Sequence, residues 1–175
     1  MKRKVRKISL ARIESNAWLK TNALDVRGNV LSIGSGGDGD WAGKKYKDYF
    51  VNATNYYTSD VIKNKYSDLV VDVCNMAEIK NETYDCVFCW SVLEHVFNFH
   101  KAIDEITRIL KKNGILILAV PFMLEVHMKM DYWRFTGAAI VSLFKDKYKI
   151  LRLDPITAGN SRKNARGYCV KLVKV

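Results

Sequence analysis

Proline and cysteine are scarce in this chain of 175 residues, which contains two prolines and four cysteines. Two prolines cannot build a proline-rich linker, and no internal repeat divides the sequence. A chain of this length can bury a core without disulfides. The longest apolar run, residues 114–120, is far shorter than the roughly 18 residues of a membrane span. We therefore expect one domain that does not span a membrane.

The start of the chain is basic, but no apolar stretch follows it. A secretory signal needs such a stretch of roughly 7–15 residues, so we expect an intracellular, cytoplasmic protein. Cys86 and Cys89 form a C-x-x-C pair within a strand-like apolar run. Residues three apart on a strand point to opposite faces, and no second pair follows. We expect buried, reduced thiols and no metal site.

Acidic residues are outnumbered, with 18 Asp and Glu against 29 Lys and Arg, and the net charge is +11. Residues 1–20 carry +6 of this charge. We therefore expect a basic N-terminal helix or arm over residues 1–28, followed by the main domain over residues 29–175. A basic arm can contact a polyanion such as nucleic acid, anionic lipid or a phosphorylated substrate. The alternative is a solvated basic helix.

Apolar segments of strand and helix length alternate along the chain. Helices are expected over residues 8–25, 99–112 and 137–146, and strands over 29–33, 56–59, 68–71, 85–90, 114–120, 149–153 and 168–174. This alternation predicts a single α/β domain: a doubly wound, mostly parallel sheet of about seven strands, the last antiparallel, with helices on both faces.

Three local signals refine the helices. Leu10, Ile13, Ala17 and Leu24 form an apolar stripe that predicts the buried face of the first helix. Asn98 and Thr136 are expected to cap the second and third helices. Lys111, Lys112 and Gly114 are expected to close the second helix at its C-terminus.

A glycine cluster follows the first expected strand. Gly34, Gly36 and Gly39 match G-x-G-x-x-G, and Asp60 lies 21 residues further on, at the end of the second strand. A carboxylate there can accept both hydroxyls of an adenosine ribose. Gly43 weakens the following segment as a pyrophosphate-binding helix start. Asp72, at the end of the third strand, can accept from an adenine amino group, which favours S-adenosylmethionine over a dinucleotide.

Five segments in order resemble class I S-adenosylmethionine-dependent methyltransferases: residues 31–39, 46–60, 72–76, 84–96 and 109–118. The resemblance spans roughly residues 29–153 and implies S-adenosylmethionine as cofactor. The cofactor-binding residues that it implies are Gly34, Ser35, Gly36, Gly37, Asp60, Val61, Asp72, Val73, Trp90, Ser91 and His95. Ser32 stands where this family usually has an acid.

The segment between Pro121 and Thr136 is rich in ionisable and aromatic residues for a connector. It resembles a motif in a branch of the family associated with glycan or small-molecule modification. On this interpretation His127 is the candidate general base, Tyr132 and Trp133 wall the acceptor, and Arg134 holds an acid or the loop. The alternative is a structural loop tied by an ion pair of Arg134 with Asp131.

These features predict methyl transfer to an oxygen or nitrogen of a small-molecule or sugar acceptor. An RNA methyltransferase is the first alternative, with the basic arm and residues 161–166 holding phosphates. A non-catalytic, methyltransferase-like binding protein is the second, because Ser32 replaces the usual acid.

Overall fold

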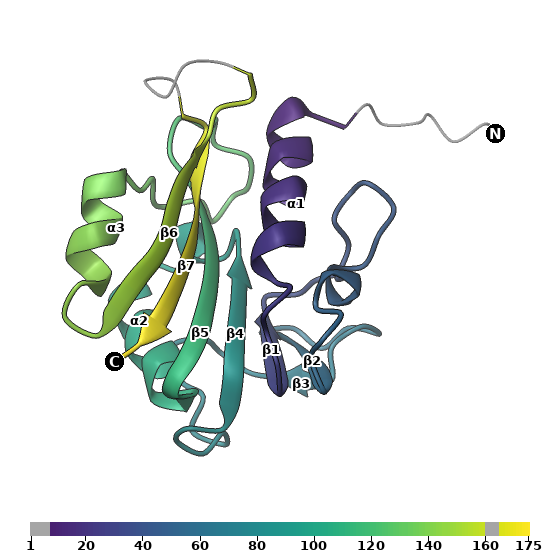
Figure 1. Cartoon of the computed structure of the whole chain (residues 1–175), viewed down its shortest axis with the longest axis vertical. Helices are drawn as coiled ribbons and strands as arrows, with labels where there is room; N and C mark the ends of the chain where they lie inside the picture. The colour runs from purple at the N-terminus through teal and green to yellow at the C-terminus, as the bar shows by residue number, and fades with distance from the viewer. Residues whose placement is uncertain (1–7, 160–164) are drawn as a thin grey trace.

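The computed structural model describes residues 8–159 and 165–175, and seven strands form one sheet (Figure 1). The strand order is β3-β2-β1-β4-β5-β7-β6. The strands are β1 Asn29–Ile33, β2 Asn55–Asp60, β3 Leu69–Val70, β4 Tyr84–Trp90, β5 Leu110–Pro121, β6 Tyr148–Ile156 and β7 Gly167–Lys174. Strands β1 to β5 pair in parallel, whereas β7 runs antiparallel between β5 and β6. The expected fold, including the antiparallel last strand, is confirmed.

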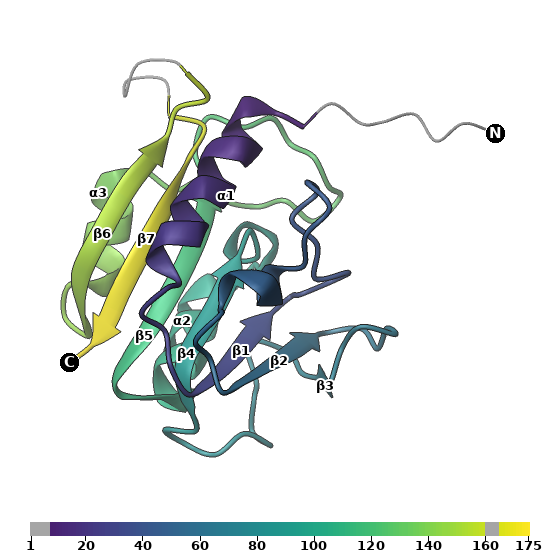
Figure 2. The same ribbon diagram turned by 45° about the vertical axis from the view of Figure 1, so that its right-hand side comes forward.

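Helices cover both faces of the sheet. Helix α1 (Leu10–Asn22) lies on one face, and α2 (Phe99–Ile109) and α3 (Gly137–Phe144) lie on the other (Figure 2). Two short 3-10 helices, η1 (Tyr46–Tyr49) and η2 (Leu93–His95), follow the ends of β1 and β4 in the chain. Within the described part of the chain, no helix has both the length and the apolar character needed to cross a membrane.

Strand alternation divides the core into two clusters. Cys86 and Phe88 face α1, whereas Val87 and Cys89 face α2 and α3. Cys86 and Cys89 are therefore buried, free and on opposite faces, as expected. Burial raises the pKa of both thiols, which keeps them protonated and unreactive.

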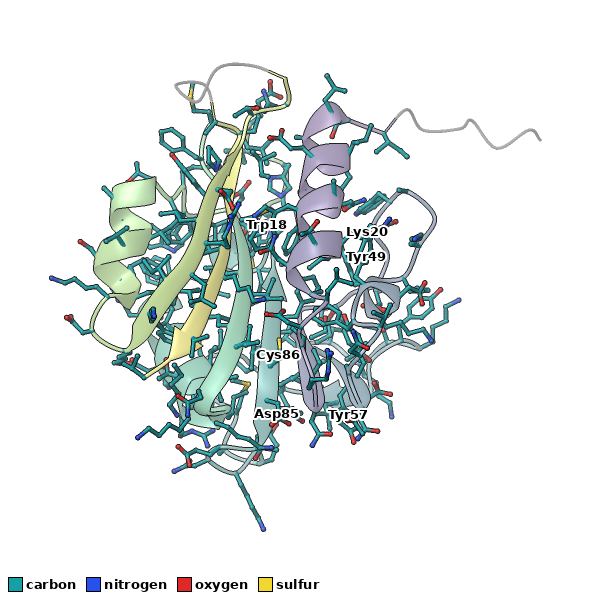
Figure 3. All side chains as sticks on the ribbon, in the orientation of Figure 1. Trp18, Lys20, Tyr49, Tyr57, Asp85 and Cys86 are labelled. Atoms are coloured by element: carbon teal, nitrogen blue, oxygen red, sulfur yellow. The ribbon has the colours of Figure 1, made fainter. Side chains whose placement is uncertain are left out.

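The expected buried face of α1 is wrong. Leu10, Ile13, Ala17 and Leu24 are exposed, and the helix instead buries Ser15, Asn16 and Leu19. The reason is that α1 lies over polar segments as well as over the sheet. Trp18, labelled in Figure 3, donates from Nε1 to Asp154 at 2.7 Å. Glu14 accepts from the backbone N–H groups of Thr157 and Ala158 at 3.0 and 2.7 Å. Helix α1 therefore packs directly on the sheet and shares a hydrophobic core with it.

The two expected caps are confirmed, but the expected end of α2 is wrong. Asn98 accepts from the Lys101 N–H and Thr136 from the Ala139 N–H. Helix α2 stops at Ile109, five residues before Gly114, because Leu110 already pairs with Tyr84 of β4. Lys111 binds Asp85 at 2.8 Å instead of helix carbonyls (Figure 3 labels Asp85).

A side-chain clamp on α2 holds the segment after β3. Glu105 accepts from the Met76 N–H at 2.7 Å and from Arg108 at 2.8 Å. Arg108 in turn donates to the carbonyls of Met76 and Ile79. The hydrogen bonds from Arg108 outweigh burial and lower the pKa of Glu105. This clamp fixes the backbone of Met76 and Ile79, which follow Asp72 in the chain.

Glu105→Gln is expected to lower the free energy of unfolding by about 1–3 kcal/mol near pH 7, the usual range for hydrogen bonds to a charged group. Because the folded-state pKa of Glu105 is lowered, its stabilisation is complete above the unfolded-state value of about 4.3 and is lost as the pH falls through the folded value. Urea unfolding at pH 7 and at about pH 3.5 measures this. The exposed Glu125→Gln is the control. A difference from wild type that is equal at both pH values would contradict the assignment.

Candidate functional site

The glycine loop, residues 34–39, leaves the carboxyl end of β1 and is bonded to the end of β2. Gly34 and Gly36 have φ values of +62° and +53°, a region that favours glycine. The Ser35 N–H donates to the Ser59 carbonyl at 2.9 Å, and the Gly36 N–H donates to Asp60 Oδ2 at 3.0 Å. The structure therefore brings the predicted ribose-binding carboxylate directly against the glycine loop.

Gly34 is also required by a close approach to the turn after β4. A Cβ at this position would lie 2.7 Å from Val92 Cγ2. Ser91, the neighbouring residue, has a φ of +56° although it is not glycine. Strained backbone of this kind concentrates at functional sites. The ends of β1, β2 and β4 thus meet, as expected at the carboxyl edge of a parallel sheet.

Two buried aspartates brace the glycine loop from within. Asp38 accepts from the Tyr56 hydroxyl at 3.0 Å, and burial raises the pKa of its carboxyl group. Asp40 is fully buried and accepts from the Tyr49 hydroxyl at 2.6 Å (Figure 3 labels Tyr49). It also accepts from the N–H groups of Ala42 and Lys44 at 2.7 and 3.0 Å. Asp38 fills an unspecified position of the glycine pattern and Asp40 directly follows it, so neither was predicted from the sequence, yet both hold the shape of the loop.

The remaining residues expected to bind a cofactor differ in exposure. Asp72 is exposed in the turn after β3, and its Oδ1 accepts from the Cys74 N–H at 2.8 Å. Val61 is exposed next to Asp60, whereas Val73 is buried in the core. Asp60, Val61 and Asp72 therefore present groups to solvent at the sheet edge.

A cavity of about 150 Å³ opens between α1 and the carboxyl ends of β4 and β5. Trp90 and Ser91 line it from β4, and Arg12 lines it from α1. Trp90 packs beside Trp18, with ring centroids 6.3 Å apart. The predicted site residue Trp90 therefore forms part of the wall of this cavity, on the face of the sheet that α1 covers.

The histidine loop, residues 122–134, follows β5 and is held by one ion pair. Arg134 contacts both carboxylate oxygens of Asp131, at 2.5 and 2.9 Å, and the Asp131 side chain is 0% exposed. Hydrogen bonds from Arg134 lower the pKa of Asp131 well below its usual range. The same guanidinium donates to the carbonyls of Leu124 and Glu125. Arg134 thus holds both an acid and the loop, and the ion pair with Asp131 that the structural alternative expected is present.

The two expected wall residues also contact η2. The backbone N–H groups of Tyr132 and Trp133 donate to the Glu94 carbonyl at 2.8 and 3.3 Å. Trp133 Nε1 donates to the carbonyls of Val96 and Phe97, so this indole is a structural anchor. Tyr132 is 46% exposed and presents its side chain to solvent beside Phe97.

These contacts bring His127 beside His95 and Glu94. The two imidazole rings are 5.1 Å apart, and His95 Nε2 lies 3.9 Å from Glu94 Oε1. His127 Nδ1 lies 3.0 Å from Asp131 Oδ2, and the His127 side chain is 40% exposed. The structure thus places His95 next to the histidine loop and close to His127, the predicted base.

Glu94 is a functional candidate whose burial the sequence did not reveal. It is 1% exposed, and burial raises its pKa to about 7. Its position in an apolar stretch, Val92-Leu93-Glu94, was the only available signal. A carboxyl group whose pKa burial raises, next to other ionisable side chains, is typical of functional sites.

Comparisons with known sequences identify one family. A family model described as "Methyltransferase domain" matches residues 3–148. A segment of 41 residues is 56% identical to an uncharacterized protein of Methanocaldococcus jannaschii; it covers 23% of this chain and 18% of that protein. The match therefore spans less than a fifth of the length of this relative.

Solved structures with a similar fold include two N-methyltransferases. The 1,6-didemethyltoxoflavin-N1-methyltransferase of Burkholderia thailandensis, crystallised with its substrate and S-adenosylhomocysteine, has a TM-score of 0.71 and 14% identity over 99% of this chain and 82% of that chain. NodS of Bradyrhizobium japonicum WM9, in complex with S-adenosylhomocysteine, has a TM-score of 0.71 and 13% identity over 94% and 87% of the two chains.

A third similar structure is a complex of the Haloferax volcanii Trm112 methyltransferase activator with a methyltransferase. The matching chain has a TM-score of 0.68 and 17% identity, over 93% of this chain and 92% of that chain. At such identities the likeness shows a shared fold.

Arg134→Met is expected to lower the free energy of unfolding by about 2–4 kcal/mol, because it leaves the buried Asp131 carboxylate without its partner. Urea unfolding at neutral pH measures the loss. Arg152→Met is the matched control: Arg152 pairs with Asp154 on the surface with 58% of its side chain exposed, and its loss should cost less than about 1 kcal/mol. Equal losses in the two variants would refute a special role for the Arg134 pair.

Proposed function

Because the chain belongs to the methyltransferase domain family of S-adenosylmethionine-dependent enzymes, we propose that it methylates an oxygen or nitrogen atom of a small molecule or sugar. The observation that carries this proposal is the arrangement at the carboxyl edge of the sheet. The glycine loop, with Asp60 bound to it, contacts the turn after β4 at Val92, and the histidine loop, which carries His127, contacts the next residues at Glu94. The first group suits a cofactor, and the second suits an acceptor.

The cofactor is proposed to lie across the ends of β1, β2 and β3. Residues 34–37 approach it with backbone, as glycine and serine permit. The Asp60 carboxylate retains lone pairs for two ribose hydroxyls, beyond its contacts with the N–H groups of Gly36 and Ile62. Asp72 would accept from the adenine amino group, with Val61 and Val73 flanking the ring. Ser91, at the end of β4, would complete this site, and the cofactor would supply the methyl group for transfer.

The acceptor is proposed to enter from the cavity beneath α1. Leu124 of the histidine loop is part of the cavity wall, so the cavity and the loop are continuous. A volume of about 150 Å³ suits a small acceptor or the end of a larger one. Arg12 and Arg166 line the same cavity and would favour an acceptor with an anionic group.

His127 is the proposed catalytic residue. Methyl transfer is an in-line displacement at the sulfonium methyl group, and the acceptor oxygen or nitrogen must lose a proton as its bond to carbon forms. Asp131 contacts Nδ1 of His127 and leaves Nε2 as the ring nitrogen that can accept this proton. Tyr132 is proposed to line the acceptor site beside His127. Trp133 and Arg134 hold the histidine loop in place.

The basic N-terminal segment is proposed to contribute contact with a polyanion. Five of the seven Lys and Arg residues within 1–20 lie outside the described residues. Residues 161–164 of the expected phosphate-holding loop also lie outside them. The RNA alternative therefore rests on charge alone, whereas the small cavity supports the small-molecule acceptor.

S-adenosylhomocysteine is expected to bind with 1:1 stoichiometry in calorimetry, and NAD is not. Asp60→Ala should weaken S-adenosylhomocysteine binding at least about tenfold, because each hydrogen bond to a charged group is worth roughly 1.5–3 kcal/mol. Asp146→Ala, which alters an exposed carboxylate on the α3 side, is the control and should bind normally. Binding of NAD without S-adenosylhomocysteine would overturn the proposed function.

His127→Ala is expected to lower turnover by about 10²–10⁴-fold, the usual contribution of general base catalysis, while S-adenosylhomocysteine affinity stays near that of wild type. The measurement is transfer of a labelled methyl group to extracted metabolites, glycans and RNA, followed by kinetics on the acceptor found. His100→Ala, at an exposed histidine stacked on Phe99, is the matched control. Full turnover of His127→Ala would show that the histidine loop only lines the acceptor site and supplies no general base.

A further inference from the structure

Three side chains that can ligate a metal converge where the histidine loop meets η2. Glu94, His95 and His127 each offer one ligand atom, and these atoms all lie within 4.8 Å of one another. We propose that these residues, the His–Glu cluster, form a binding site for a divalent transition-metal cation such as Zn²⁺ or Co²⁺. Two imidazoles and one carboxylate are a ligand set that such ions prefer.

The two imidazoles are held as metal ligands usually are. His95 Nδ1 lies 2.5 Å from the Met130 carbonyl oxygen, which fixes the proton on Nδ1 and leaves the lone pair on Nε2. His127 Nδ1 lies 3.4 Å from the Glu125 carbonyl oxygen and 3.0 Å from Asp131 Oδ2, and these two acceptors favour the proton on Nδ1 of the second ring. Metal-binding histidines typically donate their other ring N–H to a carbonyl or carboxylate in this way. Asp131 is itself held by Arg134.

Glu94 supplies an independent indication of a missing partner. Its side chain is 1% exposed, and among the described residues its Oε2 has no hydrogen-bond partner. Burying a carboxylate without a partner is unfavourable, and native proteins rarely retain such a group without a role. A cation in the His–Glu cluster would bind the Glu94 carboxylate, whose Oε1 faces His95, and would offset the cost of burying this group.

The cluster needs only a small contraction to bind a cation. Metal–ligand bonds of about 2.0–2.1 Å place tetrahedral ligand atoms roughly 3.3–3.5 Å apart, compared with separations of up to 4.8 Å in this structure. The His127 side chain, 40% exposed on a loop, has room to move toward the others. Three protein ligands leave a fourth position open for water or an acceptor oxygen, as in catalytic zinc sites.

This site goes beyond methyl transfer, and its role in the reaction rests on the proposed function. One Nε2 lone pair cannot hold a cation and accept a proton at the same time. With a cation bound, His127 is a ligand, and the cation lowers the pKa of a hydroxyl group that coordinates at the open position. The proton-accepting role of His127 applies to the cation-free ring.

The test uses the full chain without a histidine tag, freed of metal with a chelator and titrated with Co²⁺ alone. Visible absorbance follows the coordination, and Zn²⁺ competition in calorimetry gives the affinity. We expect one site per chain. Loss of a partner that only orients a ligand weakens metal binding by about 10–100-fold, so removal of a ligand in Glu94→Gln, His95→Gln or His127→Gln should weaken it at least that much. His100→Gln, the matched control at the third histidine, should bind like wild type.

A second measurement separates a metal site from a structural role. Without metal, Glu94→Gln should melt at or above the wild-type temperature, because it removes an unpartnered buried charge. Added Zn²⁺ should raise the melting temperature of wild type and not of this variant.

Two outcomes would overturn the proposal. One is absence of 1:1 binding at Co²⁺ concentrations up to about 1 mM, a free energy near −4 kcal/mol. The other is undiminished binding in Glu94→Gln with a thiolate-to-cobalt absorption band, which would assign the metal to cysteine. Binding of S-adenosylhomocysteine is measured separately, so failure of the metal site and failure of the methyltransferase assignment can be told apart.

Discussion

The ion pair between Asp131 and Arg134 is the interaction on which the acceptor side of this protein depends. The loop after β5 has no helix or strand of its own, so its backbone groups need partners from side chains. Arg134 satisfies the carbonyls of Leu124 and Glu125 in the first half of the loop while it neutralises Asp131 in the second. Asp131 then contacts the His127 ring. One buried pair therefore sets the loop shape and the orientation of the proposed catalytic imidazole together.

The cofactor side depends on a different constraint, the parallel direction of β1, β2 and β4. Parallel strands end at the same edge, so residues far apart in sequence meet there. The Gly36 N–H reaches Asp60 across 24 residues, and Gly34 lies against Val92 with no room for a Cβ. Buried Asp38 and Asp40 stabilise the loop between these contacts.

Helix α1 shows why a hydrophobic pattern can mislead at a site. Its apolar stripe faces solvent, whereas its buried face carries Ser15 and Asn16 and sends Trp18 and Glu14 to polar partners. A helix that covers a cavity mouth must satisfy the polar groups found there, and burial of those contacts competes with burial of apolar side chains. Arg12 on the same helix lines the cavity. The basic segment is therefore part of the proposed acceptor site as well as a carrier of charge.

The sequence by itself determined the sheet, its mostly parallel direction, the two N-caps and the glycine loop with Asp60. These depend on local spacing: alternation within strands, a capping side chain beside its N–H group, and glycine where the backbone must turn. Only the tertiary structure decided which face of α1 is buried and where α2 ends and β5 begins. It also decided that Glu94 and His95 lie beside His127. Those outcomes depend on contacts across 26 to 143 residues of sequence, from Leu110 against Tyr84 to Glu14 against Thr157. A local sequence pattern cannot predict such contacts, because they depend on how the whole chain packs.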